Sequence, residues 1–283
     1  MTLQWPRISI VMPSFNQVAF IERAINSVLS QDYSNKELII IDGGSTDGSV
    51  EIITKYEKHL AYWVSEKDRG QTHALNKGFS RARGDIAAWL NSDDMYPLGS
   101  LSTAASVFRE YPDLDIVYGN MNIIDVNDNV IGEMRYTRLW YPMVSLLGNV
   151  LPQPPAFWRR SLFDRIGYLD ESLRFAMDYD FMCRAAEVAR VRHIRRCTSL
   201  FRSQPGQKSQ TINEVGDAES AAARARHVPR ACGRVPRSVM FAACHIARMV
   251  FFLAQGDVLY VTKGFARRLM NRARCHQSEL ALF

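Results

Sequence analysis

Residues 85–97 read DIAAWLNSDDMYP, an apolar run that ends in two adjacent carboxylates, Asp93 and Asp94. The apolar part does not alternate between polar and apolar residues, which is typical of a strand covered on both faces of a sheet. Adjacent carboxylates repel each other unless water or a cation screens their charge. The stretch therefore predicts a buried strand over 85–91 that ends either in an acidic site or in an ordinary hydrated loop.

The same kind of strand recurs through the first 119 residues, and helical patterns separate the repeats. Strands are predicted over 7–13, 37–42, 61–65, 85–91 and 115–119, and helices over 18–31, from GGSTDGS to about 58, over 71–82 and over 98–110. Ser45 or Thr46 is the expected cap of the second helix. This order predicts an α/β fold with a single doubly wound, mostly parallel, Rossmann-like sheet.

Polar residues follow three of these strands, as PSFN (13–16), DGGS (42–45) and NSDD (91–94). Open α/β sheets bind ligands beyond the carboxyl ends of their strands, so the three clusters are expected to face one crevice. Neither GxxxxGK[ST] nor GxGxxG occurs there, which disfavours a Walker ATPase and a dinucleotide-dependent dehydrogenase.

The rest of the chain divides into two parts. Residues 120–210 mix a hairpin that turns at 127–129, a proline-stiffened loop over 151–158, and helices over 161–166 and 178–189. Residues 211–283 form a helical, basic tail. Eleven Lys or Arg face two acidic residues over 221–283, whereas residues 1–220 hold 24 basic and 27 acidic residues and show no nucleic-acid footprint.

Cysteine usage and the N-terminus predict a cytoplasmic protein. The five cysteines are scattered and never form CxxC, which fits a reducing compartment better than a zinc site or a disulfide framework. The stretch MTLQWPRISIVMP does not have the charged and apolar segments of a signal peptide.

Five motifs resemble family 2 glycosyltransferases of the GT-A fold, in the DGGSTDG-type subgroup. In chain order they are IVMPSFNQ, VLSQDYSNKELIIIDGGSTDGSVEII, SEKDRG, NKGFSRARGDIAAWLNSDD and FAMDYDF, and they cover roughly residues 7–205. The resemblance implies an inverting enzyme whose half 1–119 binds a nucleotide sugar and whose half 120–210 carries the catalytic base and the acceptor. UDP is the expected nucleotide, with GDP and dTDP left open.

By this resemblance the acidic pair holds Mg or Mn against the diphosphate of the donor. A divalent cation neutralises the charge that grows on the leaving group, and hard carboxylate oxygens suit such ions. Asp94 is the first choice for the metal, and Asp93 is assigned to the metal or to the donor ribose.

The nucleoside is expected to bind between the first two strands. Pro13, Ser14 and Asn16 are implied to line its pocket, with Asp42 at the base or ribose. Many relatives carry a second acidic residue where this chain has Gly43, so that contact is not expected here. A plain turn and helix cap is the alternative for this segment.

Asp68 and Arg69 match a donor-binding segment of the relatives. An ordinary surface ion pair is the alternative for them.

Asp178 is the expected general base, because inverting transfer needs one group to take the proton of the acceptor hydroxyl. A carboxylate favoured by the start of a helix is the alternative, and Asp180 is expected to cap that helix. Gln153 and Arg202 are expected to border the acceptor site and the diphosphate, and a structural role is the favoured alternative for both. The QxxRW signature of processive relatives is absent, which predicts the addition of one sugar per encounter.

The tail suggests a membrane partner. Residues 238–262 are apolar, but charges at 237, 248 and 257 leave uninterrupted stretches too short for the roughly 20 residues of a span. An amphipathic helix followed by the cationic segment 263–274 predicts an in-plane anchor on anionic lipid at the inner face of the plasma membrane. Such a position suits a polyprenyl-linked glycan as acceptor. A helix packed on the catalytic domain is the alternative.

Three other functions are weighed against this reading. A scaffold that binds a nucleotide sugar without transfer is disfavoured by the presence of both acidic motifs. Nucleic-acid binding by the basic tail is disfavoured because few aromatic residues lie among its charges. Nucleotidyl transfer would differ by releasing pyrophosphate.

Overall fold

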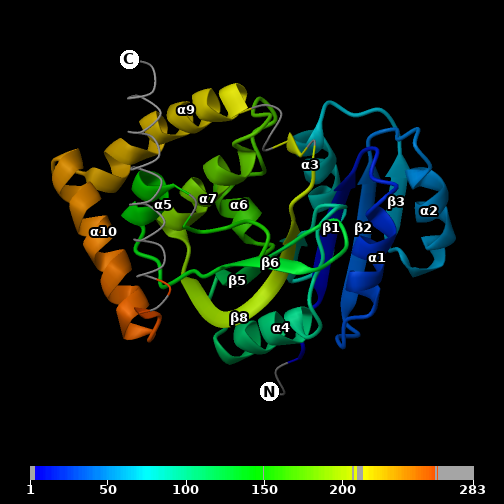
Figure 1. Cartoon of the computed structure of the whole chain (residues 1–283), viewed down its shortest axis with the longest axis horizontal. Coiled ribbons are helices and arrows are strands. Elements are labelled where there is room, and N and C mark those ends of the chain that lie inside the picture. The colour runs from blue at the N-terminus through cyan, green and yellow to red at the C-terminus, as the bar shows by residue number, and fades with distance from the viewer. Residues whose placement is uncertain (1–3, 149, 206, 209–212, 259, 261–283) are drawn as a thin grey trace, which may run out of the picture.

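The computed structural model describes residues 4–148, 150–205, 207–208, 213–258 and 260. The strands are β1 (Ile8–Ser14), β2 (Lys36–Asp42), β3 (Tyr62–Ser65), β4 (Ile86–Trp89), β5 (Ile116–Ile124), β6 (Val130–Met134), β7 (Ala156–Arg159) and β8 (Val191–Arg202). They form one sheet in the order β3-β2-β1-β4-β7-β5-β6, with β8 paired to β5 (Figure 1).

Helices cover both faces of this sheet. They are α1 (Ile21–Leu29), α2 (Ser49–Lys55), α3 (Gln71–Arg81), α4 (Ser100–Glu110), α5 (Pro142–Leu147), α6 (Leu162–Ile166), α7 (Met177–Val188), α9 (Asn213–Cys232) and α10 (Arg237–Ala254), with a 3₁₀ turn η1 (Glu57–His59). Ile10 and Met12 of β1 belong to the core shared with α1 and α4, whereas Val11 belongs to the core shared with α3, α6 and α7. The expected doubly wound arrangement is confirmed.

The four N-terminal strands are parallel, and the sheet becomes mixed beyond them. β1 pairs in parallel with β2 and β4, and β2 pairs in parallel with β3. β7 then inserts between β4 and β5 and is antiparallel to both. Three of its four residues lie in the predicted loop 151–158, so that loop prediction was wrong at its end. The apolar residues Ala156 to Trp158 are buried and complete the middle of the sheet.

The cap predicted for the second helix was also wrong. α2 begins at Ser49 after Gly48, whose φ of 104° lies in the region that favours glycine. The side chain that acts at this turn is that of Asp47, whose Oδ1 accepts hydrogen bonds from the backbone N–H of Ser49 at 3.0 Å and from its Oγ at 2.6 Å. Ser45 and Thr46 instead join β1 to β2, as described below.

The C-terminal helices pack on the second half of the domain. α9 contacts α5 and α7, and α10 contacts α5 and α9. Cys244 and Phe252 of α10 are buried, and Arg248 lies over the Phe252 ring at 5.7 Å from its centroid. The polar residues His245 and Arg248 of α10 and Gln255 at its end are half-buried, and Gln255 contacts His193 of β8, so part of the polar side of this helix faces the protein. The cationic segment 263–274 lies outside the described residues.

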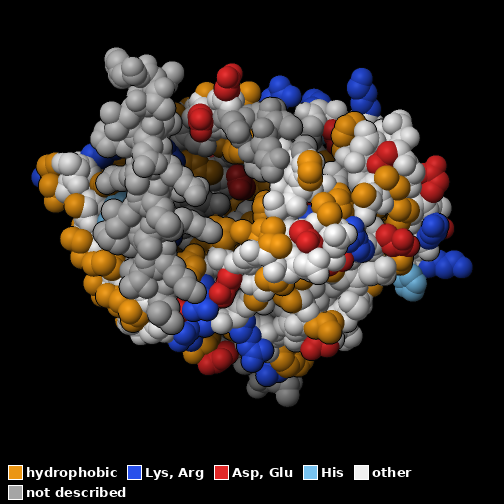
Figure 2. Space-filling view, in the orientation of Figure 1, with side chains coloured by type: hydrophobic (Ala, Val, Ile, Leu, Met, Phe, Trp, Pro, Cys, Tyr) orange, Lys and Arg blue, Asp and Glu red, His pale blue; other side chains and the backbone are white. Residues whose placement is uncertain are grey.

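The other face of α10 is apolar and exposed. Figure 2 shows hydrophobic side chains along the lower left edge, where Figure 1 places α10. The exposed residues of this apolar stripe are Val239, Ile246, Met249, Val250 and Leu253. Within the described part of the chain, α10 is the one helix long and apolar enough to cross a membrane by length and composition, with a mean hydropathy of 1.4. The sequence predicted that α10 is too interrupted by charge to span a membrane. Arg237 and Arg248 nevertheless leave it within the limits of length and hydropathy for a span.

Candidate active site

The acidic pair lies in the turn that follows β4, and its two carboxylates have different surroundings. Asp94 is 1% exposed, and its oxygens accept hydrogen bonds from the backbone N–H of Arg202 at 2.9 Å and from Asn91 Nδ2 at 3.0 Å. Asp93 is half-buried, and its Oδ2 accepts a hydrogen bond from Gln204 Nε2 at 2.8 Å. Burial raises the pKa of both carboxyls, and the charge of Asp93 raises the pKa of Asp94 further.

These surroundings suit a site in which the half-buried Asp93 is one ligand of a hard cation, better than a metal site closed by protein groups. Among the described residues, no group of three His, Cys, Asp or Glu could hold a metal ion. Mg²⁺ binds through one or two carboxylates and takes its other oxygens from water and substrate phosphates. A cation would also stabilise the ionised forms of two carboxyls whose pKa values are raised. The half-buried Asp93 is better placed for this than Asp94, whose oxygens already accept hydrogen bonds that hold the turn together.

Arg202 supports the acidic pair from inside the protein. Its side chain is fully buried, Nε donates to the carbonyl of Asp93 at 2.7 Å, and Nη1 donates to the carbonyl of Asp125 at 2.6 Å. Nη2 forms an ion pair with Asp128 Oδ1 at 2.6 Å. The guanidinium therefore joins the acidic turn to the 125–128 turn, which is the structural role weighed as the alternative to a diphosphate contact.

The ends of β1 and β2 are joined by hydrogen bonds that fix the predicted nucleoside segment. Asn16, at a φ of 51°, accepts a hydrogen bond from the backbone N–H of Thr46 on Oδ1 at 3.0 Å. Its own N–H donates to Ser45 Oγ at 2.8 Å. Asp42 is fully buried and accepts hydrogen bonds from the N–H groups of Gly44 and Ser45 and from Ser65 Oγ. Asp42 thus organises the turn.

Three other side chains lie at the end of β1. Pro13 is buried, and Ser14 is 3% exposed with an Oγ that has no hydrogen-bond partner within the described residues. Phe15 is 60% exposed, so its ring presents an aromatic surface beside the turn. Sequence reasoning quoted Phe15 within its motif but did not select it as a site residue.

Asp68 lies against Gly43. A Cβ atom built on Gly43 would be 2.8 Å from Asp68 Oδ2 and 3.3 Å from the ring of Phe15. Asp68 therefore places a carboxylate next to the position where many relatives carry a second acidic residue. Arg69 is 70% exposed and forms an ion pair with Glu171 at 2.5 Å. A surface ion pair is the alternative that the sequence offered to donor binding by this residue.

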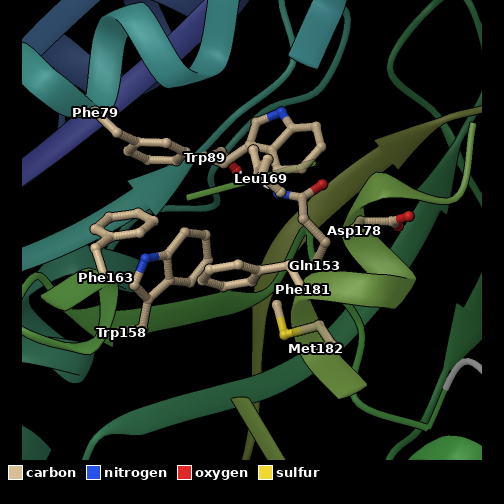
Figure 3. Close-up of a pocket in the computed structure, with 9 residues that line it drawn as sticks. All are labelled: Phe79, Trp89, Gln153, Trp158, Phe163, Leu169, Asp178, Phe181 and Met182. Atoms are coloured by element: carbon tan, nitrogen blue, oxygen red, sulfur yellow. Dashed lines mark hydrogen bonds between the residues drawn. The ribbon is translucent and has the colours of Figure 1, made fainter. Parts of the chain in front are cut away.

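Asp178 lies in the first turn of α7 and is half-buried. Its Oδ1 accepts a hydrogen bond from the backbone N–H of Tyr179 at 2.8 Å, and burial raises its pKa. Figure 3 shows its carboxylate pointing away from the rings of Trp158 and Phe163, which line the same pocket. A carboxyl with a raised pKa and an accessible edge can accept a proton from a substrate hydroxyl.

Gln153 and Asp180 lie close to Asp178 but are engaged elsewhere. Gln153 is 4% exposed and donates from Nε2 to the carbonyl of Trp89 at 2.7 Å, which joins its loop to β4. Asp180 does not cap α7, so that prediction was wrong. It binds Arg184 Nε at 2.9 Å and Arg226 Nη1 at 3.0 Å instead, because its position in the helix directs it toward α9.

A chain of hydrogen bonds connects the acidic pair with the surroundings of Asp178. Lys208 Nζ donates to Gln71 Oε1 at 3.0 Å, and Gln71 Nε2 donates to Asn91 Oδ1 at 2.9 Å. Asn91 donates to Asp94, and the charge of Lys208 lowers the pKa of Asp178, although burial dominates. Sequence reasoning missed Lys208, Gln71 and Gln204; the polar run SQPGQKSQ after β8 was the one signal for Gln204 and Lys208.

Comparisons with known proteins identify the family and the fold of the chain. The model of "Glycosyl transferase family 2" matches residues 9–175. An uncharacterized glycosyltransferase of Rickettsia typhi is 30% identical over 193 residues, which are 66% of this chain and 60% of that protein. A PGL/p-HBAD biosynthesis glycosyltransferase of Mycobacterium bovis is 29% identical over 197 residues, which are 67% of this chain and 75% of that protein.

Two solved structures share the fold. TarS of S. aureus in complex with UDP-GlcNAc has a TM-score of 0.66 at 20% identity, over 85% of this chain and 73% of that chain. The mannosyltransferase PcManGT of Pyrobaculum calidifontis, in complex with GDP-Man and Mn²⁺, has a TM-score of 0.59 at 19% identity, over 93% and 83%. The expected GT-A fold is confirmed by the likeness to TarS. The chain belongs to glycosyl transferase family 2.

Proposed function

We propose that the chain transfers a sugar from a nucleotide-sugar donor, a UDP-sugar in the first instance, to an acceptor hydroxyl with inversion. The observation that carries the proposal is the pairing of two acidic centres. The half-buried Asp93 lies beyond β4, and Asp178 lies at the start of α7. Hydrogen bonds run from Asp94 through Asn91 and Gln71 to Lys208, whose charge acts on Asp178.

In this mechanism Asp178 takes the proton from the acceptor hydroxyl. The acceptor oxygen forms a bond to the anomeric carbon of the donor while the bond from that carbon to the diphosphate oxygen breaks, and the nucleoside diphosphate leaves. Because only the ionised form of Asp178 is a base, transfer falls as the pH drops through its raised pKa. Burial thus gives this carboxyl more proton affinity than a solvated aspartate has.

The donor site is assigned to the ends of β1, β2 and β4. Phe15 offers an exposed ring for the nucleobase, and Asp68 offers a carboxylate next to Gly43 for the base or ribose. Asp93 is the proposed ligand of Mg²⁺ or Mn²⁺, with Asp94 as the group that holds the turn. When bound, the cation would neutralise charge on the departing diphosphate. The solved complex of PcManGT holds GDP-Man and Mn²⁺, and this supports the choice of a nucleotide sugar and a divalent cation as the bound molecules.

A panel of UDP-, GDP- and dTDP-sugars tests the donor site by thermal unfolding with and without Mn²⁺. A ligand at a hundred times its Kd adds about 2.7 kcal/mol to the free energy of unfolding. We expect one donor to stabilise the wild type in the presence of Mn²⁺ and to lose this effect in Asp93→Asn. Asp85→Asn, near the other end of β4, is the matched control and should behave as the wild type. No stabilisation by any donor would contradict the proposal.

The acceptor is proposed to be a polyprenyl-linked glycan of the cell surface, at the inner face of the plasma membrane. The exposed apolar stripe of α10 supports contact with lipid, and the basic tail composition favours an anionic surface. The chain spans about 60% of the length of the Rickettsia typhi relative.

Flotation with vesicles tests the membrane contact. Wild type should float with vesicles that contain phosphatidylglycerol and less with pure phosphatidylcholine, and Ile246→Asp in the apolar stripe should reduce flotation. Equal flotation of this variant would contradict the assignment of the stripe to lipid.

A further inference from the structure

A second cavity lies on the other side of Asp178, between the start of α7 and α9. Its volume is about 170 Å³, and Phe175, Asp178, Tyr179, Ser220 and Arg224 are among the residues that line it. A volume of this size holds about five or six waters at ~30 Å³ each, which is the scale of one sugar ring. We call it the α7–α9 cavity.

The walls of the α7–α9 cavity have the chemistry of a sugar site. Phe175 and Tyr179 supply aromatic surface, against which the apolar C–H face of a pyranose can pack. Ser220 and Asp178 supply polar atoms for its hydroxyls. The cavity also leads to the carboxylate that acts as base in the proposed function.

Arg224 distinguishes this cavity from a general sugar site. It is exposed, its guanidinium carbon lies 5.9 Å from the centroid of the Tyr179 ring, and among the described residues no carboxylate lies within ion-pair distance of it. The two arginines that follow on the same helix do have partners, since Arg226 pairs with Asp180 and Arg230 with Glu187. Arg224 therefore presents a positive charge at the cavity that the described protein does not neutralise.

The segment that leads into α7 is already bound to a carboxylate of the protein. The carboxylate of Glu219 accepts hydrogen bonds from the backbone N–H groups of Arg174, Phe175 and Ala176 at 2.8, 2.8 and 2.9 Å. These bonds lower the pKa of Glu219 against the effect of its burial, so it stays ionised in this position. Among the residues that line the cavity, Arg224 is the one that carries a positive charge.

We propose that the α7–α9 cavity binds the acceptor sugar and that this sugar carries an acidic group, a carboxylate or a phosphate, which Arg224 binds. The inference rests on the proposed function, because Asp178 has to reach the hydroxyl of the same sugar. The inference adds a substrate class to the proposed function, because a cavity with Arg224 would prefer acidic glycans to neutral ones.

Binding of three small probes tests the inference. Methyl β-D-glucuronide carries a carboxylate, glucose 6-phosphate carries a phosphate, and methyl β-D-glucoside is neutral. Their affinities are measured by saturation-transfer NMR with EDTA present, so that a cation at Asp93 does not contribute. We expect one or both acidic probes to bind at least about tenfold more tightly than the neutral probe, as a charge-assisted hydrogen bond provides. Which of the two binds identifies the acidic group.

Two variants locate the effect. In Arg224→Gln the preference for acidic probes should fall to about one, whereas Arg234→Gln, which removes an exposed arginine outside the cavity, should keep it. Equal binding of acidic and neutral probes to the wild type, or an unchanged preference in Arg224→Gln, would overturn the inference.

The donor experiment separates this outcome from a failure of the proposed function. Stabilisation by the nucleotide sugar and Mn²⁺ should be the same in Arg224→Gln and in the wild type, because Arg224 lies outside the donor pocket. If the donor response is present while the acid preference is absent, the inference fails and the proposed function stands. If no donor binds, the proposed function fails.

Discussion

The acidic turn after β4 and the start of α7 both present carboxylates to the site, yet the protein holds them differently. Asp94 and Asp93 accept hydrogen bonds from Arg202 and Gln204, which come from a distant part of the chain, and Asn91 of the same turn adds a third. The carboxylate of Asp178 accepts one from the N–H of the residue that follows it. The comparison teaches that the donor side is fixed by tertiary hydrogen bonds, whereas the base is governed by burial and keeps an edge for the substrate.

Exchanging the carboxylates for amides gives the strongest test of this comparison. Asp178→Asn should lower transfer by about 10²–10⁴-fold, the usual contribution of a general base, while stabilisation by donor and Mn²⁺ remains. Because burial raises the pKa of Asp178 and so disfavours its ionised form, the amide should not lower the free energy of unfolding at neutral pH. Asp93→Asn should lose both transfer and the donor response. An Asp178→Asn protein that no longer responds to donor would show that the two sides are not separable.

The next largest effect is expected at Arg202, on the stability of the donor side. Arg202→Gln removes the ion pair with Asp128, which keeps its pair with Arg23, and the charged hydrogen bonds to two carbonyls. At about 1.5–3 kcal/mol for each such bond, the free energy of unfolding in urea should fall by about 3–5 kcal/mol. Arg69→Gln breaks an ion pair at a side chain that is 70% exposed and is the matched control, with an expected cost of about 1 kcal/mol or less. Similar losses in both variants would argue against the supporting role of Arg202.

A smaller effect is expected from one methyl group at Gly43. In Gly43→Ala the new Cβ would lie 2.8 Å from Asp68 Oδ2, so the carboxylate has to move; because it is the end of a flexible side chain, the cost should be at the low end of overpacking, about 1 kcal/mol. The donor response should weaken with it. Gly132→Ala is the control, since its Cβ would meet Ile123 at an ordinary 3.4 Å, and Gly43→Ala combined with Asp68→Ala should recover stability but not donor binding.

The smallest effect concerns His227, which joins α9 to α7. The hydrogen bond with Asp180 raises its pKa, and Glu187 acts in the same direction. A histidine whose folded pKa is raised contributes stability that is complete below its unfolded value of about 6.5 and is lost as the pH rises through the folded value. We expect urea unfolding to show this loss in the wild type and a flatter profile in His227→Gln. An unchanged profile would mean that the histidine is neutral throughout.

The sequence predicted the donor half better than the second half. β1, β2 and β4 are continuous apolar runs buried on both faces, so their pattern is visible without any partner. β8 carries four arginines and reads as polar, because much of it is only half-buried, and it is recognised as a strand only through its pairing with β5. β7 is four residues long and is defined by the two strands on either side of it.

The site shows the same limit. The acidic motifs were found because adjacent or closely spaced carboxylates stand out in a sequence. The contact of Lys208 with Gln71 joins residues 137 positions apart and leaves no periodic signal. Asp68 can approach residue 43 because that residue is a glycine without a side chain. In the sequence, Gly43 stood out only because many relatives have an acidic residue there.

The hydrogen bonds of Glu219 bear on how this domain can be cut and recombined. The segment that matches the family model ends at residue 175, before Asp178 and 44 positions before the carboxylate that holds the N–H group of Phe175. A chimera that joins residues 9–175 to the C-terminal helices of another relative would inherit the donor pocket but would lose this tie. Acceptor preference should therefore be transplanted with α7 and α9 moved together as a single cassette.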